Sequence, residues 1–204
     1  IGMVFVFFFF KNRGCSWLPA NRVKNSILDR VITLSDEQNA LLSKKGISKA
    51  DIIALLNDGE VDFEKSKSDG SLKIYHLSND KTALYFLLPK EAFTSEIKVI
   101  SKPVSQIKPS DKGTGTLLRF PNDKDLVFVD TTAQLNCQLS ELGFINQRLI
   151  LTQLKKSGKI NFEKSNLYAD PKPIVALEFP DKKGNMIAAK AIWYKNKINI
   201  FSLK

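Results

Sequence analysis

The feature that most constrains this chain is an eight-residue segment that occurs twice. Residues 59–66 read GEVDFEKS and residues 158–165 read GKINFEKS, so the copies start 99 residues apart (158 minus 59). Five of the eight positions are identical, whereas Glu60 and Lys159 differ in the sign of their charge. One short match can arise by chance, and the flanking segments therefore decide whether the repeat extends further.

The flanks agree with a longer repeat. Ahead of each copy lies an apolar helical segment, and before it a second helix that ends at Gly46 or Gly143. Three strand-like segments follow each copy. We therefore predict an α+β protein of two tandem repeats, each with a strand, two helices and a four-stranded antiparallel meander. We assign them to residues 30–102 and 125–204, joined by a linker at 103–124 that is rich in Pro, Gly, Ser and Lys.

Both repeats are expected to fold around equivalent cores of their own. A single continuous sheet through the two halves would contradict that expectation. At about 80 residues, each unit is large enough to fold alone.

Capping patterns place the helices. Ser35 followed by Gln38 predicts a capping box at the start of the first helix, and Ser48 followed by Asp51 predicts one at the second. Gly46 is expected to end the first helix in a left-handed conformation, and Gly59 to end the second. In the second half the corresponding caps are Thr131 with Gln134, and Asn146.

The strands follow from alternation and apolar runs. Val61 and Phe63 alternate with acidic residues, which predicts one buried face and one wet face. The run at 82–88 is almost wholly apolar and predicts a central strand covered on both faces. Further strands are expected at 31–34, 72–77, 97–101, 126–129, 174–179, 186–194 and 198–201.

The chain has 204 residues and a formal net charge of +10, which admits nucleic acid or an anionic membrane as a partner. Its lysines are scattered rather than grouped, so a solvated basic surface is the preferred interpretation. Cys15 and Cys137 are the two cysteines, and they establish neither a disulfide nor a compartment. His76 is the single histidine, and we expect no metal, no cofactor and no catalytic residue.

Residues 1–10 read IGMVFVFFFF, an uncharged apolar run that we interpret as the remnant of a membrane anchor or signal segment. A polar neck at 11–29 follows. Lys11 and Arg13 just before Cys15 are unlike a lipoprotein signal. Basic residues after the run favour a cytoplasmic flank, but whole domains translocate regardless of charge, so the side of the membrane stays open.

The neck and second helix, LPANRVKNSILDRVITLS and GISKADIIALLNDGEVDFEKS, resemble membrane-anchored members of a bacterial domain family related to the BrnT and RelE toxin fold. The resemblance is good over residues 18–101 and weaker over 125–204. It implies a helical pair on an antiparallel sheet and an envelope location facing away from the cytoplasm, that is, a periplasmic one. No activity is established for that family.

Toxins of the RelE type cleave RNA without metal, through lysine, arginine and tyrosine side chains on the sheet. The resemblance directs attention to basic and aromatic residues of the strands: Lys65, Lys73, Tyr75 and His76 in the first half, and Lys164, Lys190, Tyr194 and Lys197 in the second. None matches a toxin motif, and cleavage needs a proton donor and acceptor that converge on one bond. A half-exposed strand histidine is the preferred interpretation of His76.

Two main functional hypotheses result. The preferred one is a non-enzymatic, membrane-anchored interaction or scaffold module that offers sheet faces or edges to a protein partner in a membrane complex. The alternative is an RNA-binding or ribonuclease-like protein of the RelE/BrnT type. Binding of the basic surface to anionic lipid is a third, weaker hypothesis.

Overall fold

The computed structural model describes residues 18–99, 102–129, 138–144, 146–169 and 171–204. The first half begins with a helix, a strand and a pair of helices, and continues with four strands. These elements are α2 (Pro19–Leu28), β1 (Val31–Ser35), α3 (Asp36–Lys44), α4 (Lys49–Asp58), β2 (Glu60–Lys67), β3 (Leu72–Ser78), β4 (Ala83–Pro89) and β5 (Thr94–Lys98).

The segment between the halves and the second half supply the remaining elements. The connecting segment forms the short 3-10 helix η1 (Val104–Gln106) and strand β6 (Thr114–Arg119). The second half contains β7 (Val127–Val129), α6 (Gln147–Ser157), β8 (Lys159–Asn166), β9 (Ile174–Pro180), β10 (Met186–Tyr194) and β11 (Lys197–Leu203). Residues 138–141 are also helical.

The described strands form one 11-stranded sheet in the order β2-β3-β4-β5-β1-β6-β8-β9-β10-β11-β7. Within each half the order is the same. The meander β2–β5 ends beside β1, which is parallel to β5, and the meander β8–β11 ends beside β7, which is parallel to β11. The registers therefore define equivalent positions in the two halves, such as Asp62 opposite His76 and Asn161 opposite Ala176.

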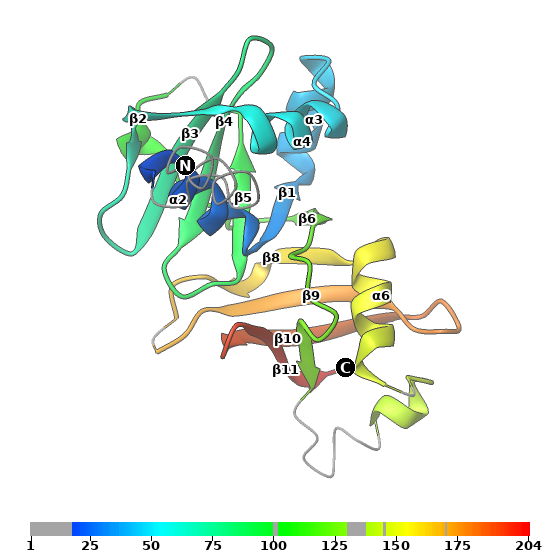
Figure 1. Ribbon diagram of the computed structural model, residues 1–204. Coiled ribbons are helices and arrows are strands. Elements are labelled where there is room, and N and C mark those ends of the chain that lie inside the picture. The colour runs from blue at the N-terminus through cyan, green and yellow to red at the C-terminus, as the bar shows by residue number, and fades with distance from the viewer. Residues whose placement is uncertain (1–17, 100–101, 130–137, 145, 170) are drawn as a thin grey trace, which may run out of the picture.

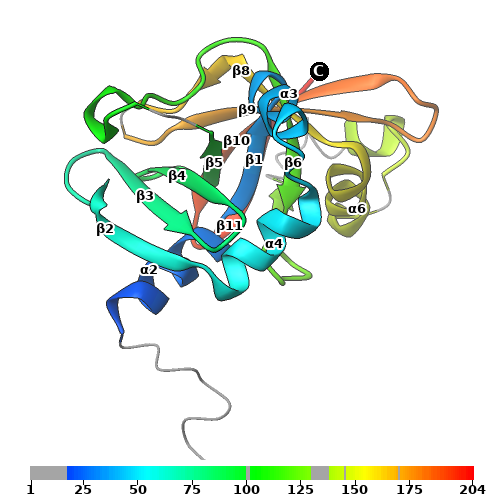
Figure 2. The same cartoon turned by 90° about the horizontal axis from the view of Figure 1, so that it is seen from above.

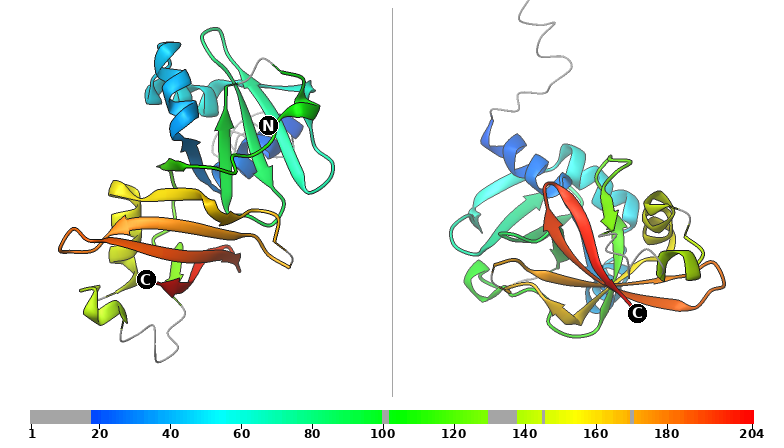
Figure 3. Two further views of the ribbon diagram at one scale, coloured as in Figure 1. Left: turned by 180° about the vertical axis from the view of Figure 1, so that it is seen from behind. Right: turned by 90° about the horizontal axis from the view of Figure 1, so that it is seen from below.

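The expectation that each repeat folds as a separate unit around a core of its own is wrong, because β6 joins the halves into one continuous sheet. It pairs antiparallel with β1 on one side and antiparallel with β8 on the other. Figure 1 shows the first half above, the second half below and β6 between them, and Figure 3 shows the same arrangement from behind. Part of the expected linker is thus an internal strand of the sheet.

The registers also show that the second half is turned over relative to the first. With one antiparallel strand between them, β8 runs parallel to β1, whereas its equivalent β2 runs antiparallel to β1. Leu117 of β6 packs in the core of the second half, and the next residue, Leu118, packs against the core of the first. In β1, which pairs regularly with β5, Val31 packs in the core of the second half and Ile32 in the core of the first. Since successive strand residues point to opposite faces, the two cores lie on opposite faces of the sheet. Figure 2 shows α3 and α4 grouped together and α6 apart from them.

Two large apolar clusters correspond to the two halves. The first joins α2, α3 and α4 to one face of the first-half strands, through residues such as Ile27, Leu55 and Phe86. The second joins α6 to the second-half strands, and it also includes Val31 and Phe93 from the first half. The cores are therefore distinct but in contact.

Local sequence signals set the helix boundaries. The predicted capping box of Ser48 and Asp51 is confirmed, and Gly46 and Gly143 have φ of +68° and +77°. At the first helix the box is only half formed. Ser35 Oγ accepts the Gln38 N–H, but Gln38 Oε1 instead accepts the Val99 N–H at 2.7 Å. Buried Gln38 therefore links α3 to the end of β5. The predicted cap of Thr131 and Gln134 lies outside the described residues.

Three sequence expectations differ from the structure. The neck contains α2, which begins at Pro19 and buries Val23 and Ile27 one helical turn apart. The last strand of the first half begins at Thr94 rather than Ile97 and is described to Lys98, and residues 100–101 of the expected strand lie outside the described residues. Phe63 is exposed rather than on a buried face. Residues 1–10, the predicted anchor, lie outside the described residues, and among those described no helix combines the length and apolarity needed to cross a bilayer.

Replacing Gly115 of β6 is expected to destabilise the protein. A Cβ on Gly115 would lie 2.6 Å from the Leu34 carbonyl oxygen and 2.8 Å from Phe162 Cε2, so backbone on one side and a buried ring on the other must shift. We expect Gly115→Ala to lower the free energy of unfolding by about 1–3 kcal/mol, measured by urea denaturation. Thr116→Ala, at the exposed neighbouring position, is the control and should change it by less than about 0.5 kcal/mol. Equal effects of the two substitutions would show that β6 is not tightly packed.

Candidate functional site at the open edge of the sheet

The repeated octamer forms a bulge within β2. Asp62 is paired with His76 and Lys67 with Ile74, so the intervening residues on β2 outnumber those on β3. Asp62 Oδ1 accepts the N–H groups of Glu64 and Lys65, both at 3.1 Å. Ser66 Oγ donates to the Asp62 carbonyl at 2.5 Å and accepts the His76 N–H at 3.0 Å. Together these bonds satisfy backbone groups that the bulge removes from the ladder.

The second copy forms the same bulge in β8. Asn161 is paired with Ala176 and Asn166 with Ile174. Asn161 Oδ1 accepts the Lys164 N–H at 3.0 Å, and Ser165 Oγ donates to the Asn161 carbonyl and accepts the Ala176 N–H. The octamer is therefore a bulge motif in which an Asp or Asn oxygen and a serine hydroxyl replace ladder hydrogen bonds.

The first half adds a polar cluster to this bulge. Lys65 Nζ lies 2.7 Å from Asp62 Oδ2, and His76 Nδ1 lies 3.8 Å from the same oxygen. The His76 ring packs on Tyr85, with centroids 4.7 Å apart. His76 is 8% exposed, so the expectation of a half-exposed histidine is wrong; Tyr85 is also buried, and Lys65 is exposed. The cluster therefore combines the carboxylate of Asp62, the imidazole of His76 and the phenol of Tyr85, with the ammonium group of Lys65 beside the carboxylate.

Burial sets the charge state of this cluster. It lowers the pKa of His76 below the ordinary value of 6.5; nearby Lys65 lowers it further, and Asp62 opposes both. Hydrogen bonds from Lys65 hold the pKa of the Asp62 carboxyl below its usual range. His76 Nδ1 is buried and has no hydrogen-bond partner among the described residues. Neutral imidazole is therefore favoured at pH 7, beside an ion pair that Asp62 forms with Lys65.

The two copies differ most at the edge of the sheet. In the second half β8 is paired with β6, and Phe162 is 2% exposed. In the first half β2 is the end strand of the described sheet, and the equivalent Phe63 is 51% exposed. Figure 1 shows β2 at the outer side of the first half. The same motif thus buries its aromatic ring only where a further strand lies against it.

Of the residues singled out in the first half, two meet and two do not. Lys65 and His76 both approach Asp62, whereas Tyr75 points to the opposite face and packs in the core beside α2, α3 and α4. Lys73 is exposed. Sequence reasoning missed Asp62 and Tyr85 as partners of His76. The available signal was pairing, since Tyr85 lies directly opposite His76 in the β3–β4 hairpin.

The four residues singled out in the second half do not converge. Lys164 Nζ is 3.4 Å from Glu178, and Lys197 donates to the Asp125 carbonyl at 2.8 Å. Tyr194 lies between the ammonium groups of Lys172 and Lys195, 5.0 and 5.2 Å from its ring centroid. Lys190 occupies the position equivalent to Tyr85 and is exposed. With Ala176 in place of His76, the second half has no counterpart of the acid–base cluster.

The connecting segment covers part of the first-half face on which His76 lies. Ile107 and Val104 pack on Ile74, Tyr85 and Leu87. Ser110 holds a buried ion pair, because its N–H and Oγ donate to Glu96 at 2.9 and 2.6 Å and its Oγ accepts from Lys98 at 2.7 Å. This face is therefore largely closed. Helix η1 and helix α2 also contact β2, and the exposed residues of that strand, such as Glu60, Phe63 and Glu64, form the accessible border.

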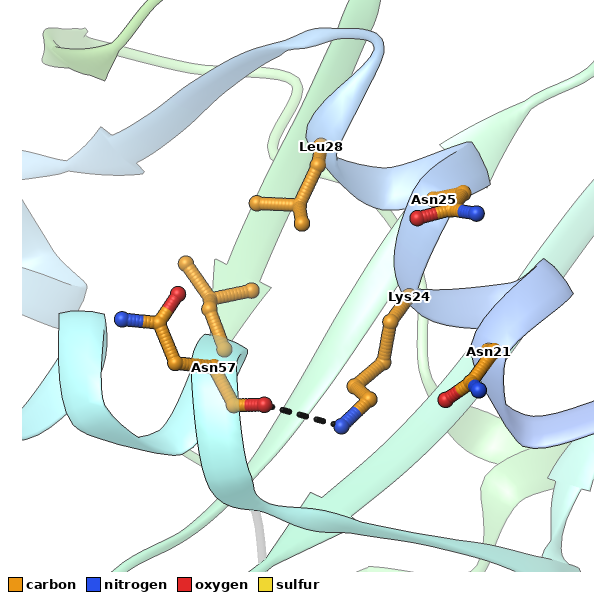
Figure 4. Close-up of a pocket in the computed structure, with 6 residues that line it drawn as sticks. Asn21, Lys24, Asn25, Leu28 and Asn57 are labelled. Atoms are coloured by element: carbon orange, nitrogen blue, oxygen red, sulfur yellow. Dashed lines mark hydrogen bonds between the residues drawn. The ribbon is translucent and has the colours of Figure 1, made fainter. Parts of the chain in front are cut away.

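A cavity of about 310 Å³ lies between α2 and α4, near the start of β2. Its one cationic lining group is Lys24, whose ammonium group donates to the Asn57 carbonyl at 2.9 Å and the Gly59 carbonyl at 3.3 Å (Figure 4). Lys24 thus caps the C-terminal end of α4. The cavity therefore lies at the contact between α2 and α4, which Lys24 holds together, and its lining residues indicate no particular ligand.

Within the described residues, no group of three or more His, Cys, Asp or Glu side chains is placed to hold a metal ion. Cys15 and Cys137 lie outside these residues. In comparisons with protein-family models, curated proteins and solved structures, the chain matches none of them. The bulges and the sheet edge are therefore the features of this chain that bear on its function.

Removal of His76 is expected to weaken the acid sensitivity of folding. Because the pKa of His76 is lowered in the folded state, the unfolded chain binds more protons at and below about pH 6.5, and stability falls as the pH falls through that window. In His76→Ala this contribution is absent, and the backbone bond to Ser66 stays available. The free energy of unfolding, measured at pH 7.5 and 5.5, should therefore decrease less in the variant than in the natural chain.

Lys73→Ala, an exposed position on the same strand, is the control and should keep the full pH dependence. An unchanged difference between the two pH values in His76→Ala would contradict the assignment.

Proposed function

We propose that this chain is a non-enzymatic, membrane-anchored protein-interaction module of the bacterial envelope, built from two copies of a RelE/BrnT-like unit. The repeated strand order and the identical bulges support the duplication. The apolar run at 1–10 and the resemblance over residues 18–101 support the anchor and the envelope location.

The observation that carries the interaction role is the contrast between Phe63 and Phe162. They occupy equivalent positions in the same motif and are 51% and 2% exposed. An unpaired strand offers a row of backbone donors and acceptors, and proteins ordinarily blunt or cover such edges. The β2 strand has two such devices, a bulge and several charged residues, but just before the bulge it presents an exposed aromatic side chain. A large exposed aromatic ring beside unpaired backbone groups supports a role in contacting another chain.

Phe63→Ser is expected to abolish capture of a stoichiometric partner. The tagged full chain would be recovered from detergent-solubilised bacterial membranes, and co-purifying proteins would be quantified against the natural chain. We expect at least a tenfold loss, because an anchor residue at the centre of an interface contributes about 2 kcal/mol or more.

Phe128→Ser is the matched control. Phe128 is 43% exposed on β7, at the opposite end of the sheet, and its replacement should leave capture unchanged. Failure of the natural chain to recover any stoichiometric partner would count strongly against the proposed function, and so would full capture by Phe63→Ser.

A second candidate function, RNA binding or cleavage, is favoured by one observation. Lys65, His76 and Tyr85 lie together in a chain with a net charge of +10. Binding through phosphates must weaken steeply as salt rises, and cleavage that uses His76 must be lost in His76→Ala. Filter binding of single-stranded RNA at low and high salt tests this alternative, and an absence of binding at low salt eliminates it.

A further inference from the structure

The β6–β8 pairing shows what fits the edge of this motif. Thr114, Gly115 and Thr116 of β6 pair with Asn161, Ile160 and Lys159 of β8. The Phe162 N–H donates to the Gly113 carbonyl at 2.9 Å. The equivalent positions in the first half are Asp62, Val61, Glu60 and Phe63, and they lie on the end strand of the described sheet.

The backbone of β2 is arranged to receive a strand in the same way. In an antiparallel pair, residues two apart point their N–H and C=O groups to the same neighbour. Because the Phe162 N–H points to β6, the equivalent N–H of Phe63 and the backbone groups of Val61 point to the open side. Both bulges place Asp62 and Asn161 in the same register, so the geometry just before the bulge is shared.

A small residue suits the position that faces Val61. In the second half that position belongs to Gly115, where a Cβ would lie 2.6 Å from the Leu34 carbonyl oxygen of β1 and 2.8 Å from Phe162 Cε2. Of these two contacts, the one with the phenylalanine ring has an equivalent at the β2 edge, where a small residue leaves room for the ring of Phe63.

The charges at the edge select the neighbours of that small residue. Glu60 replaces Lys159, Asp62 replaces Asn161, and both Asp58 and Glu64 are exposed nearby. Lys65, which is paired with Asp62 at 2.7 Å, and Lys67 lie on the same strand, so four acids stand against two lysines between Asp58 and Lys67. Pairing of β2 with β2 of a second copy would bring these acids together, and like charges directly opposite each other are destabilising. The acidic edge of this otherwise basic chain instead matches a strand with basic side chains.

We propose that the β2 edge binds one extended segment of a partner protein, antiparallel to β2, in which a small residue is flanked on both sides by Lys or Arg. The small residue faces Val61 beside Phe63, and the basic residues face Glu60 and Asp62. The basic residue opposite Asp62 would share that carboxylate with Lys65, which lies 2.7 Å from it. This inference rests on the proposed interaction function and specifies the chemistry of the partner.

A peptide derived from β6 tests the inference directly. Residues 111–119 carrying Thr114→Lys and Thr116→Lys have the required pattern of a small residue between two lysines. Binding of the labelled peptide to the full chain would be followed by fluorescence anisotropy. We expect saturable binding that weakens with salt, and at least a tenfold loss when the peptide also carries Gly115→Val.

Variants of the full chain locate the site. Glu60→Lys gives the first half the charge found at Lys159, and it should weaken binding of the lysine peptide at least tenfold. The same variant should bind a peptide with glutamate at position 116 better than the natural chain does. Equal binding of the lysine peptide by Glu60→Lys and the natural chain overturns the inference, since the peptide would then occupy another site, such as that of β6 itself.

Three outcomes separate this inference from the proposed function. If no peptide binds although Phe63→Ser loses its partner from membranes, the partner chemistry is wrong and the interaction function stands. If sedimentation shows a dimer of the natural chain that Phe63→Ser dissolves, the occupant is a second copy and the inference is overturned. If Phe63→Ser retains its partner, the proposed function itself fails.

Discussion

The structure depends on the insertion of β6 between β1 and β8. This strand has a neighbour on each edge and a core on each face, because Leu117 belongs to the second apolar cluster and Leu118 packs against the first. Gly115 permits the close approach, since the Leu34 carbonyl and the Phe162 ring occupy the space where a side chain would stand. Removing β6 would leave two exposed strand edges and open both clusters. The halves are therefore coupled through backbone pairing as well as through side-chain contact.

A single intervening strand also explains why the halves face opposite ways. One antiparallel strand reverses the direction of the next, so β8 begins the second meander in the direction opposite to β2. The equivalent unit must then be turned over, and its helix covers the other face of the sheet. A linker without a strand would impose no such relation. The strand order of each half is preserved because the added strand lies outside both meanders.

Much of the local structure could be predicted from sequence, because capping and apolar runs act over a few residues. Ser48, Asp51 and the run at 82–88 each specify their element, and β4 is buried on both faces as expected. The role of β6 could not be predicted, since TGTLLR lies among Pro, Gly and Lys and forms a strand only because two edges are available to it. The exposure of Phe63 was missed for the complementary reason: the octamer is locally the same in both halves, and only the neighbouring strand differs. The candidate cluster could be predicted only in part. His76 and Lys65 can be singled out in the sequence, but their approach to Asp62 depends on the bulge.

The comparison between the halves separates what the motif needs for folding from what only one copy carries. A single side-chain oxygen at position 62 or 161 is enough to cap the bulge, as Asn161 shows. The second carboxylate oxygen of Asp62 is therefore not required by the bulge, and it binds Lys65 and faces His76. The glycines that begin the octamer have the same task in both copies, since a Cβ on Gly59 or Gly158 would overlap the carbonyl oxygen of Leu55 or Leu154.

Differences concentrate instead at the strand edge: Glu60 against Lys159, Asp62 against Asn161, and an exposed against a buried phenylalanine. One edge is filled by the chain's own β6 and carries no exposed apolar ring, whereas the other combines open backbone groups, an aromatic ring and negative charge. Because the bulge is the same in both copies, this divergence is best explained by what each edge contacts, which is β6 in the second half and no strand of the described sheet in the first.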